Sequence, residues 1–333
     1  MNGPIEPTRE REGLDPGAPG RRSLIVGCGY VGEAVARRLG ALGHEVFGLR
    51  RSDPNTLAPG LPYRPLQGDL TDPRSLEALE ALDMPFDCVV HTVSASGGDA
   101  ETYRRVYFEG TGHLLDRLRR HPPGAFVYTS STGVYSQTDG SWVDEQSPTE
   151  PRSESGVWLV RTEQRILEAC REWGLAGCIL RVAGIYGPGR GSLLRRVVSG
   201  QAQLEGSGDR WTNRIHREDL ADAVVATLSR GRPGEVYNVA DLEPATQRTV
   251  LDWLSKQTGV PLGESGGTSQ PTTRRRGDSN KRVRVDKLRR ETGWNPAHPS
   301  FREGYLEELG RVGDGESTEG TGGGGQPVSR VGS

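Results

Sequence analysis

Three glycines mark the motif in this chain with the clearest chemistry, 27-GCGYVG-32, which matches the pattern G-x-G-x-x-G. A short apolar run, 23-SLIV-26, precedes the motif, and a helical pattern follows it. In that context Gly27 permits a tight turn, Gly29 lets a pyrophosphate approach the backbone, and Gly32 lets helix and strand pack closely. The first N–H groups of the helix and its positive dipole end would hold the phosphates. The motif therefore predicts a dinucleotide site, with a purely structural turn as the alternative; its other expected contacts are Tyr30 and Val31.

Basic residues follow the second expected strand and bear on which dinucleotide is bound. Sites for NAD usually place an acidic residue here, where it accepts a hydrogen bond from the ribose 2′-hydroxyl. In this chain Arg50 stands at about that position, followed by Arg51 and Ser52. Two guanidinium groups suit a 2′-phosphate, so we expect NADP in preference to NAD. Solvated loop arginines, or Asp53 turned back toward the ribose, are the alternatives.

Polar residues after the later strands complete the expected cofactor contacts. Asp69, in 68-GDLTD-72, could accept a hydrogen bond from the adenine amino group. The alternative for Asp69 is a turn or N-cap residue. Thr92 and Ser130, near the ends of two later strands, are also expected to line the cofactor.

Alternating strand and helix patterns must position these residues. Such an alternation predicts a parallel sheet covered by helices on both faces, which is the doubly wound α/β Rossmann class. The expected strands are 23–26, 45–49, 86–93, 125–131, 177–187 and 235–240, and the expected helices are 30–42, 74–82, 103–120, 157–174 and 216–230.

The composition excludes several classes of protein. The 333 residues include 42 Lys and Arg and 44 Asp and Glu, for a formal net charge of −2. We therefore expect no nucleic-acid or anionic-membrane partner. The four cysteines show no C-x-x-C spacing, so we expect reduced, buried thiols and no metal site. The first twenty residues hold no apolar signal segment, and no run of 18 apolar residues occurs, so we expect a cytoplasmic protein.

Six further segments, in a fixed order, resemble the extended short-chain dehydrogenase/reductase superfamily, that is, the NAD-dependent epimerase/dehydratase family. The resemblance covers about residues 22–310 and implies a Rossmann domain with a smaller C-terminal α/β lobe that closes over a small-molecule substrate, often a nucleotide sugar. The segments are 86-FDCVVHTVSA-95, 109-EGTGHLL-115, 127-VYTSSTGVY-135, 180-LRVAGIYGPGR-190, 214-RIHREDLADAV-224 and 236-VYNVAD-241.

The resemblance divides the chain. We expect a Rossmann domain at 21–180, to which 214–240 return, and a substrate-binding lobe at 181–213 and 241–311. The compositions of 1–20 and 312–333 indicate disordered tails. The family's frequent dimerisation through the helix at 157–174 implies a homodimer, which the sequence leaves open.

The family's reaction centre is a Ser or Thr followed by Tyr-x-x-x-Lys, in which the Lys lowers the pKa of the Tyr that transfers a proton. Ser131 falls at the serine position, where it would orient substrate. The register through Glu163 puts Ser155 at the tyrosine position and Leu159 at the lysine position. A register two residues later would give Val157 and Arg161. Either way the tyrosine is missing, and the chain looks like an atypical branch, the YeeZ-like short-chain dehydrogenase/reductases.

Other residues must then supply the chemistry. Tyr135, Tyr186 and His216 are candidate acid/base groups, and the alternative for each is local packing or hydrogen bonding. Arg190 and Arg214 are candidates for binding an anionic substrate, as is Arg181.

Three hypotheses follow. The first is an NADP-dependent oxidoreductase or epimerase-like enzyme acting on a small, sugar-like or anionic substrate. The second is a non-catalytic NADP(H)-binding sensor or scaffold. The third is a structural Rossmann-like protein without a cofactor.

Overall fold

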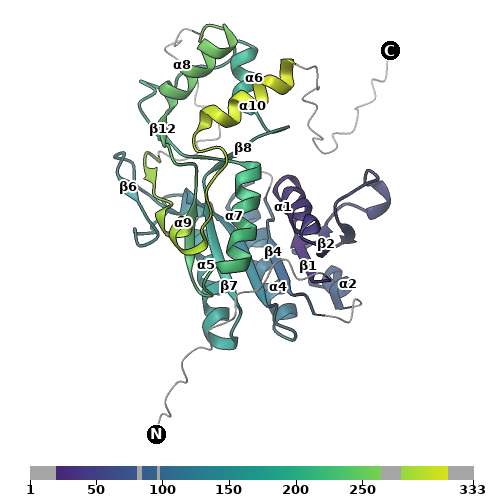
Figure 1. Cartoon of the computed structure of the whole chain (residues 1–333). Coiled ribbons are helices and arrows are strands. Elements are labelled where there is room, and N and C mark those ends of the chain that lie inside the picture. Colours follow the sequence, from purple (N-terminus) through teal and green to yellow (C-terminus); the bar gives the residue numbers. More distant parts are fainter. Residues whose placement is uncertain (1–19, 81–84, 96–97, 264–278, 314–333) are drawn as a thin grey trace, which may run out of the picture.

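The computed structural model describes residues 20–80, 85–95, 98–263 and 279–313 (Figure 1). Most of the two expected tails lies outside these residues, as does a basic cluster at 274–276. Within them, helices cover both faces of one large sheet, and a smaller lobe sits at one end of it.

Seven parallel strands form the central sheet: β1 (Arg22–Val26), β2 (Glu45–Arg50), β3 (Arg64–Gln67), β4 (Cys88–His91), β5 (Ala125–Ser131), β7 (Gly177–Val182) and β11 (Val236–Val239). Their order is β11-β7-β5-β4-β1-β2-β3. This is the order of a doubly wound Rossmann sheet, so the predicted fold class is confirmed. The strand order reverses between β1 and β4, and ligands of such sheets bind at the carboxyl ends of the strands beside that reversal.

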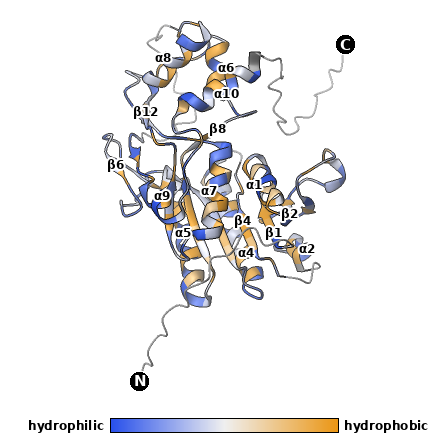
Figure 2. Ribbon diagram, viewed as in Figure 1, coloured by the Kyte–Doolittle hydropathy of each residue, from blue (hydrophilic) through white to orange (hydrophobic). Residues whose placement is uncertain are grey.

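Two hydrophobic cores lie on the two faces of the sheet (Figure 2). Successive residues of β1 point into different cores, with Leu24 and Val26 in one and Ile25 in the other, because side chains alternate along a strand. One face is covered by α1 (Tyr30–Ala41), α7 (Arg217–Arg230) and α9 (Asp286–Thr292). The other is covered by α2 (Glu77–Glu80), α3 (Ala100–Tyr103), a π-helical turn η3 (Arg104–Glu109), α4 (Gly110–Leu118) and α5 (Glu154–Trp173).

A third core belongs to the second lobe, drawn at the top of Figure 1. It is built from α6 (Ser192–Val198), α8 (Gln247–Thr258) and α10 (Phe301–Gly313), with β8 (Gly184–Tyr186) and β12 (Ala245–Thr246). Two further strands border it: β9 (Trp211–Thr212) pairs with β12, and β10 (Arg214–His216) pairs with β8, although Ile215 of β10 is buried in the core on the α1 face of the sheet. The remaining elements are β6 (Trp142–Val143), which pairs with β13 (Arg282–Val283), and the 3₁₀ turns η1 (Pro54–Thr56), η2 (Pro73–Leu76) and η4 (Thr132–Val134).

The division of the chain into domains stays a prediction. Helix α9, however, packs on the Rossmann sheet, although its residues fall in the range expected for the second lobe. We expected 241–311 in the second lobe. The structure packs α9 against β11 and α7, and Leu288 is buried with the Rossmann helices.

The strand expected over 177–187 is two strands. β7 ends at Val182 within the central sheet, and β8 pairs with β10 in a separate two-stranded sheet. The chain thus leaves the Rossmann sheet at Ala183, within 182-VAGI-185, which contains no proline or polar residue to indicate the break.

Helix α5 begins three residues earlier than expected. The hydroxyl of Ser153 accepts a hydrogen bond from the Gly156 N–H at 3.1 Å and caps the helix. The helix ends at Gly174, as predicted from that glycine, which adopts the left-handed conformation with φ 75°. No helix among the residues that the structure describes is long and apolar enough to cross a membrane.

Candidate functional site

The glycine loop links β1 to α1, and each glycine meets a different requirement. Gly27 has φ +86°, and a Cβ there would lie 2.7 Å from backbone atoms of Val93. A Cβ on Gly32 would lie 2.9 Å from the Gly27 carbonyl oxygen. A Cβ on Gly29 would meet no atom within 4 Å. The loop is therefore tightly packed at its two ends and open at its centre.

The open centre fits a diphosphate group. Gly29 is the N-cap of α1, and no side chain caps the helix there. The first N–H groups and the positive dipole end of α1 therefore remain available to an anion. The Thr92 hydroxyl donates to the Gly27 carbonyl at 3.0 Å, which ties the loop to the end of β4.

At the end of β2, Arg50 is held in place. Its Nη1 donates to the Tyr63 hydroxyl at 2.9 Å and lies 3.6 Å from Oε1 of Glu33. Arg51 and Ser52 are exposed beside it. Asp53 accepts from the Asn55 N–H at 2.9 Å and caps η1, so its Oδ1 is engaged in the turn.

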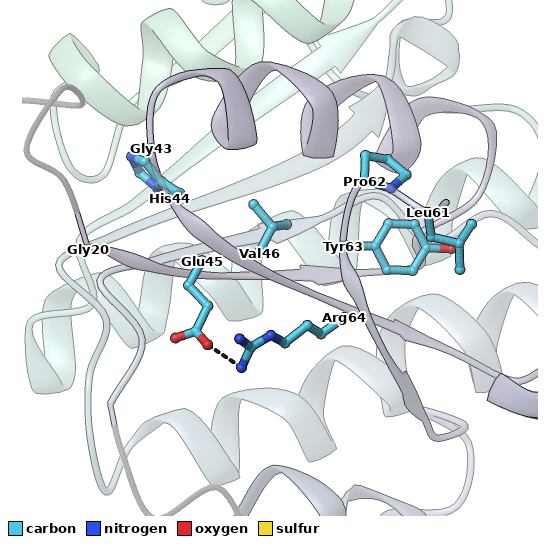
Figure 3. A pocket seen from close by; sticks show the side chains of 9 residues that line it. All are labelled: Gly20, Gly43, His44, Glu45, Val46, Leu61, Pro62, Tyr63 and Arg64. Carbon is cyan, nitrogen blue, oxygen red and sulfur yellow. Dashed lines mark ion pairs between the residues drawn. The ribbon is translucent and has the colours of Figure 1, made fainter. Parts of the chain in front are cut away.

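A surface hollow near Tyr63 lies at the other end of these strands (Figure 3). It is lined by the residues that begin β2 and β3, among them His44, Glu45 and Arg64. Because the dinucleotide crevice of such a fold lies at the carboxyl ends, this hollow is not the cofactor site.

Asp69 is engaged in a local turn. Its Oδ1 accepts from both the N–H and the hydroxyl of Thr71 at 2.9 Å. This is the turn geometry weighed as the alternative to adenine binding, which stays a prediction.

Ser131 ends β5 at the carboxyl edge of the sheet, only partly buried. Its hydroxyl accepts from the Gly133 N–H at 3.0 Å, and its own proton is free to be donated. On the neighbouring helix α5 the Ser155 hydroxyl donates to that of Ser153 at 3.3 Å, and Leu159 is packed into the core.

Ser130, one residue earlier, belongs to a buried charged network. Its hydroxyl donates to Oε1 of Glu163 at 2.5 Å, and Nη2 of Arg181 lies 2.7 Å from Oε2 of the same carboxylate. Glu163 is 2% exposed and Arg181 7% exposed. Arg181 is therefore unavailable to a substrate. Glu163 forms the structural ion pair of this network.

Tyr135 closes the network. Its hydroxyl accepts from Nη1 of Arg181 at 3.0 Å and donates to Oδ1 of Asn238 at 2.8 Å. Burial raises the pKa of Tyr135, although Arg181 opposes that shift. The Tyr135 hydroxyl is thus engaged both as a donor and as an acceptor, which corresponds to the alternative of local packing and hydrogen bonding. The catalytic role of Tyr135 stays a prediction.

Tyr186 and His216 lie together in the seam between the sheet and the second lobe. Their ring centroids are 5.4 Å apart, and the Tyr186 hydroxyl donates to the Ser300 carbonyl at 3.4 Å. His216 is buried, and both its ring nitrogens lack hydrogen-bond partners within the described residues. Burial, with the neighbouring His298, lowers the pKa of His216 to about 4, so the imidazole is neutral at pH 7.

Arg214 enters the same seam from β10. Its Nη1 donates to the Thr212 hydroxyl at 2.7 Å. Asp241, whose N–H donates to the Arg214 carbonyl, is buried with Oδ1 unpartnered among the described residues. Burial raises the pKa of Asp241 well above its usual value. The expected contact of Arg214 with an anionic substrate stays a prediction.

A staple beside His216 joins the two units. Nδ1 of His298 is 2.9 Å from Asp219 on α7, and Nε2 is 2.9 Å from Glu307 on α10. Burial alone would lower the pKa of His298, but the hydrogen bonds to Glu307 and Asp219 raise it. His216, Asp219 and His298 could each offer a metal-ligand atom, and these atoms lie within 4.8 Å of one another. Both nitrogens of His298 already meet carboxylates, which is the arrangement of a hydrogen-bonded staple.

Two ionisable side chains are buried that the sequence did not single out. Lys281 is 3% exposed, and its Nζ donates to the Tyr135 carbonyl at 3.3 Å and to Ser279 at 2.6 Å. Glu308, 6% exposed, has an unpartnered Oε1 within the described part of the chain. Both stand in runs of charged residues, which are usually solvated, so the sequence carries no signal for their burial.

Arg190 and Tyr30 meet across the seam. The Arg190 guanidinium lies 5.3 Å from the centroid of the Tyr30 ring, at the start of α1. Val31, the next residue of α1, packs partly against the core beneath.

Known proteins resemble the chain in both sequence and structure. It is 29% identical over 238 residues to the protein YeeZ of Escherichia coli (strain K12), which covers 68% of this chain and 80% of YeeZ. It is 28% identical over 253 residues to a 2-alkyl-3-oxoalkanoate reductase of Stenotrophomonas maltophilia (strain K279a), covering 71% of this chain and 74% of the reductase. A solved structure from Methylobacillus flagellatus, assigned to the NAD-dependent epimerases/dehydratases, is 31% identical, has a TM-score of 0.70, and covers 88% of this chain and 98% of its own. A family profile matches residues 23–240, and the chain belongs to the NAD dependent epimerase/dehydratase family.

Proposed function

We propose that this chain is a dinucleotide-dependent oxidoreductase or epimerase-like enzyme that favours NADP and acts on a small sugar-like or anionic substrate. The observation that carries the proposal is the uncapped amino end of α1 above the open space at Gly29. The nicotinamide, when bound, supplies hydride transfer. The protein's part is to hold the diphosphate and to orient the reacting oxygen of the substrate.

The preference for NADP is supported by the end of β2. Arg50 is fixed there by Tyr63 and Glu33, and Arg51 and Ser52 follow it in the open. A 2′-phosphate would receive charge-assisted hydrogen bonds from such a cluster, whereas the 2′-hydroxyl of NAD would gain less.

The polarising group is Ser131, whose hydroxyl proton is free to bind a substrate oxygen. The Tyr-x-x-x-Lys pair of the family is absent in our assignment, because Ser155 and Leu159 take its positions. Proton transfer would then fall to the seam, where Tyr186, His216 and Asp241 lie together. We also propose a cytoplasmic location, which suits four free cysteines.

A second candidate function is a non-catalytic NADP(H)-binding sensor. Leu159 favours it, because a core leucine stands where the family's lysine would lower a phenol's pKa. The engaged hydroxyl of Tyr135 favours it as well.

Titration with NADPH and NADH tests the binding site. We expect NADPH to bind more tightly than NADH, and Gly29→Asp to abolish binding of both by placing a carboxylate against the diphosphate. Gly40→Asp is the matched control, since Gly40 lies on the same helix and also has open space around it. Normal NADPH binding by Gly29→Asp contradicts the site, and equal or tighter NADH binding contradicts the preference.

Turnover of a panel of carbonyl compounds with bound NADPH, and of nucleotide sugars with bound NADP+, separates the two functions. Carbonyl compounds accept a hydride from the reduced cofactor, whereas sugar hydroxyls donate one to the oxidised cofactor, so the readouts are NADPH oxidation for the first and conversion of the sugar for the second. The enzyme hypothesis expects turnover that Ser131→Ala reduces strongly. Binding without turnover of any panel member selects the sensor.

A further inference from the structure

Arg190 is an exposed cation that no described carboxylate neutralises. It follows the turn at Gly187–Gly189 that leads from β8 into α6, so it is carried by the second lobe. No ion pair within 4.0 Å engages it among the residues with assigned positions. An unpaired guanidinium beside a cleft is a candidate for binding an anion.

The side chain of Arg190 lies beside the amino end of α1. Its guanidinium lies 5.3 Å from the Tyr30 ring centroid, and Tyr30 is the first residue of that helix. The N-cap Gly29, with open space beside it, is the adjacent residue. The lobe therefore brings a positive charge to the helix end that already presents free N–H groups.

Arg190 also reaches toward the loop that follows β4. Its charge acts on Tyr107, where burial raises the pKa of the phenol and Arg190 opposes that shift. The Tyr107 hydroxyl accepts from the Ala95 N–H at 3.2 Å, just beyond β4. Since β1 and β4 are neighbours, Arg190 lies over the point at which the strand order reverses. That point is where a dinucleotide crosses a doubly wound sheet.

A second arginine provides an internal contrast. Arg217 also lies over the Tyr30 ring, 4.7 Å from its centroid. Its Nη2, however, is 2.7 Å from Oε1 of Glu218, so its charge is compensated. Of these two arginines, Arg190 is the one with charge to offer a ligand.

We propose that Arg190 is a cofactor-binding residue, which binds the diphosphate of the dinucleotide together with the amino end of α1. This assignment rests on the proposed cofactor site and replaces the expected contact of Arg190 with substrate. It makes cofactor binding a contact between both lobes, because the helix belongs to the Rossmann unit and the arginine to the second lobe.

Calorimetric titration of the full chain with NADPH and with ADP-ribose 2′-phosphate tests the assignment. ADP-ribose 2′-phosphate keeps the 2′-phosphate and the diphosphate and lacks only the nicotinamide. Arg190→Gln should weaken both ligands by the same factor, about tenfold, as expected for loss of one charge-assisted hydrogen bond. Arg217→Gln should weaken them less. Arg196→Gln, on the exposed face of α6, is the matched control and should bind as the wild type does.

Three outcomes would overturn the assignment. Equal affinities for Arg190→Gln and wild type would remove Arg190 from the site and leave the proposed function standing. A loss confined to NADPH would place Arg190 at the nicotinamide and remove it from the diphosphate. If the wild type binds neither ligand, the proposed function falls and the assignment with it. An unchanged melting temperature for each variant shows that the fold is intact.

Discussion

Replacing Glu163 with glutamine should destabilise the fold without touching the cofactor loop. In the native chain the Glu163 carboxylate accepts from Ser130 and from two nitrogens of Arg181. Glutamine keeps the shape and one acceptor oxygen but loses the charge. The Arg181 guanidinium, 7% exposed, is then buried without a counter-charge.

The expected magnitude follows from that burial. Breaking a buried ion pair by neutralising one partner costs about 3–5 kcal/mol. Because glutamine retains part of the hydrogen bonding, we take the lower end, about 3 kcal/mol. For a chain of this size that lowers the melting temperature by roughly 5 °C.

Scanning calorimetry of four variants measures the effect. Glu168→Gln, exposed on the same helix, is the control and should cost no more than about 0.5 kcal/mol. Arg181→Met combined with Glu163→Gln should recover much of the loss, giving a coupling of about 2 kcal/mol in a double-mutant cycle. A melting temperature for Glu163→Gln equal to that of the control, or strict additivity in the cycle, would refute the account of this network.

Three further changes have expected outcomes. Gly27→Ala should lower the melting temperature by several degrees and remove NADPH binding, because φ at Gly27 is +86° and the new Cβ would lie 2.7 Å from Val93. Gly29→Ala is the control and should have the melting temperature of the wild type, because a Cβ there meets no atom within 4 Å. Burial raises the pKa of Glu308 from 4.5 to about 7, so the folded state holds this proton more tightly than the unfolded chain. The contribution of the protonated Glu308 to stability is therefore full below pH 4.5 and lost as the pH rises through about 7. Glu308→Gln should make the melting temperature less dependent on pH over this range. An unchanged pH profile would contradict the raised pKa of Glu308. Burial lowers the pKa of Lys281 from 10.5 to about 8, so the folded state releases this proton more readily. Lys281→Met should then stabilise the fold at pH 7 by roughly 1–2 kcal/mol, a gain that shrinks between about pH 8 and 10.5; a loss at pH 7 would show that the bonds to Tyr135 and Ser279 outweigh the buried charge.

The phosphate loop was predictable because its chemistry is local. A glycine at Gly27 can adopt a positive φ that other residues rarely adopt, and the strand before the loop and the helix after it are set by neighbouring apolar residues. The same holds for the end of α5 at Gly174. The paths of β7 and β8 were not predictable, since the residues between Val182 and Ile185 are apolar or glycine and the break depends on β10, some thirty residues later in the chain.

The charged network needed the tertiary structure. Arg181 was a candidate for binding an anionic substrate, because a guanidinium group pairs well with carboxylates and phosphates. Its partner Glu163 comes from α5, and the two meet only when that helix packs on β7. The burial of Lys281 was not predictable either, since it depends on the loop around Tyr135, which is distant in the sequence.

The order of strands in the sheet has a consequence for synthesis on the ribosome. The strands β1 to β5 can pair once Ser131 has emerged, and β7 can join them after Val182. The outer edge of β7 then waits for β11, which begins at Val236. At ribosomal speeds of about 5–20 residues per second, that edge stays bare for roughly 3–10 s. During this interval the nascent chain carries an open strand edge that can pair with another chain, and a chaperone that covers the edge would protect this protein most at that stage.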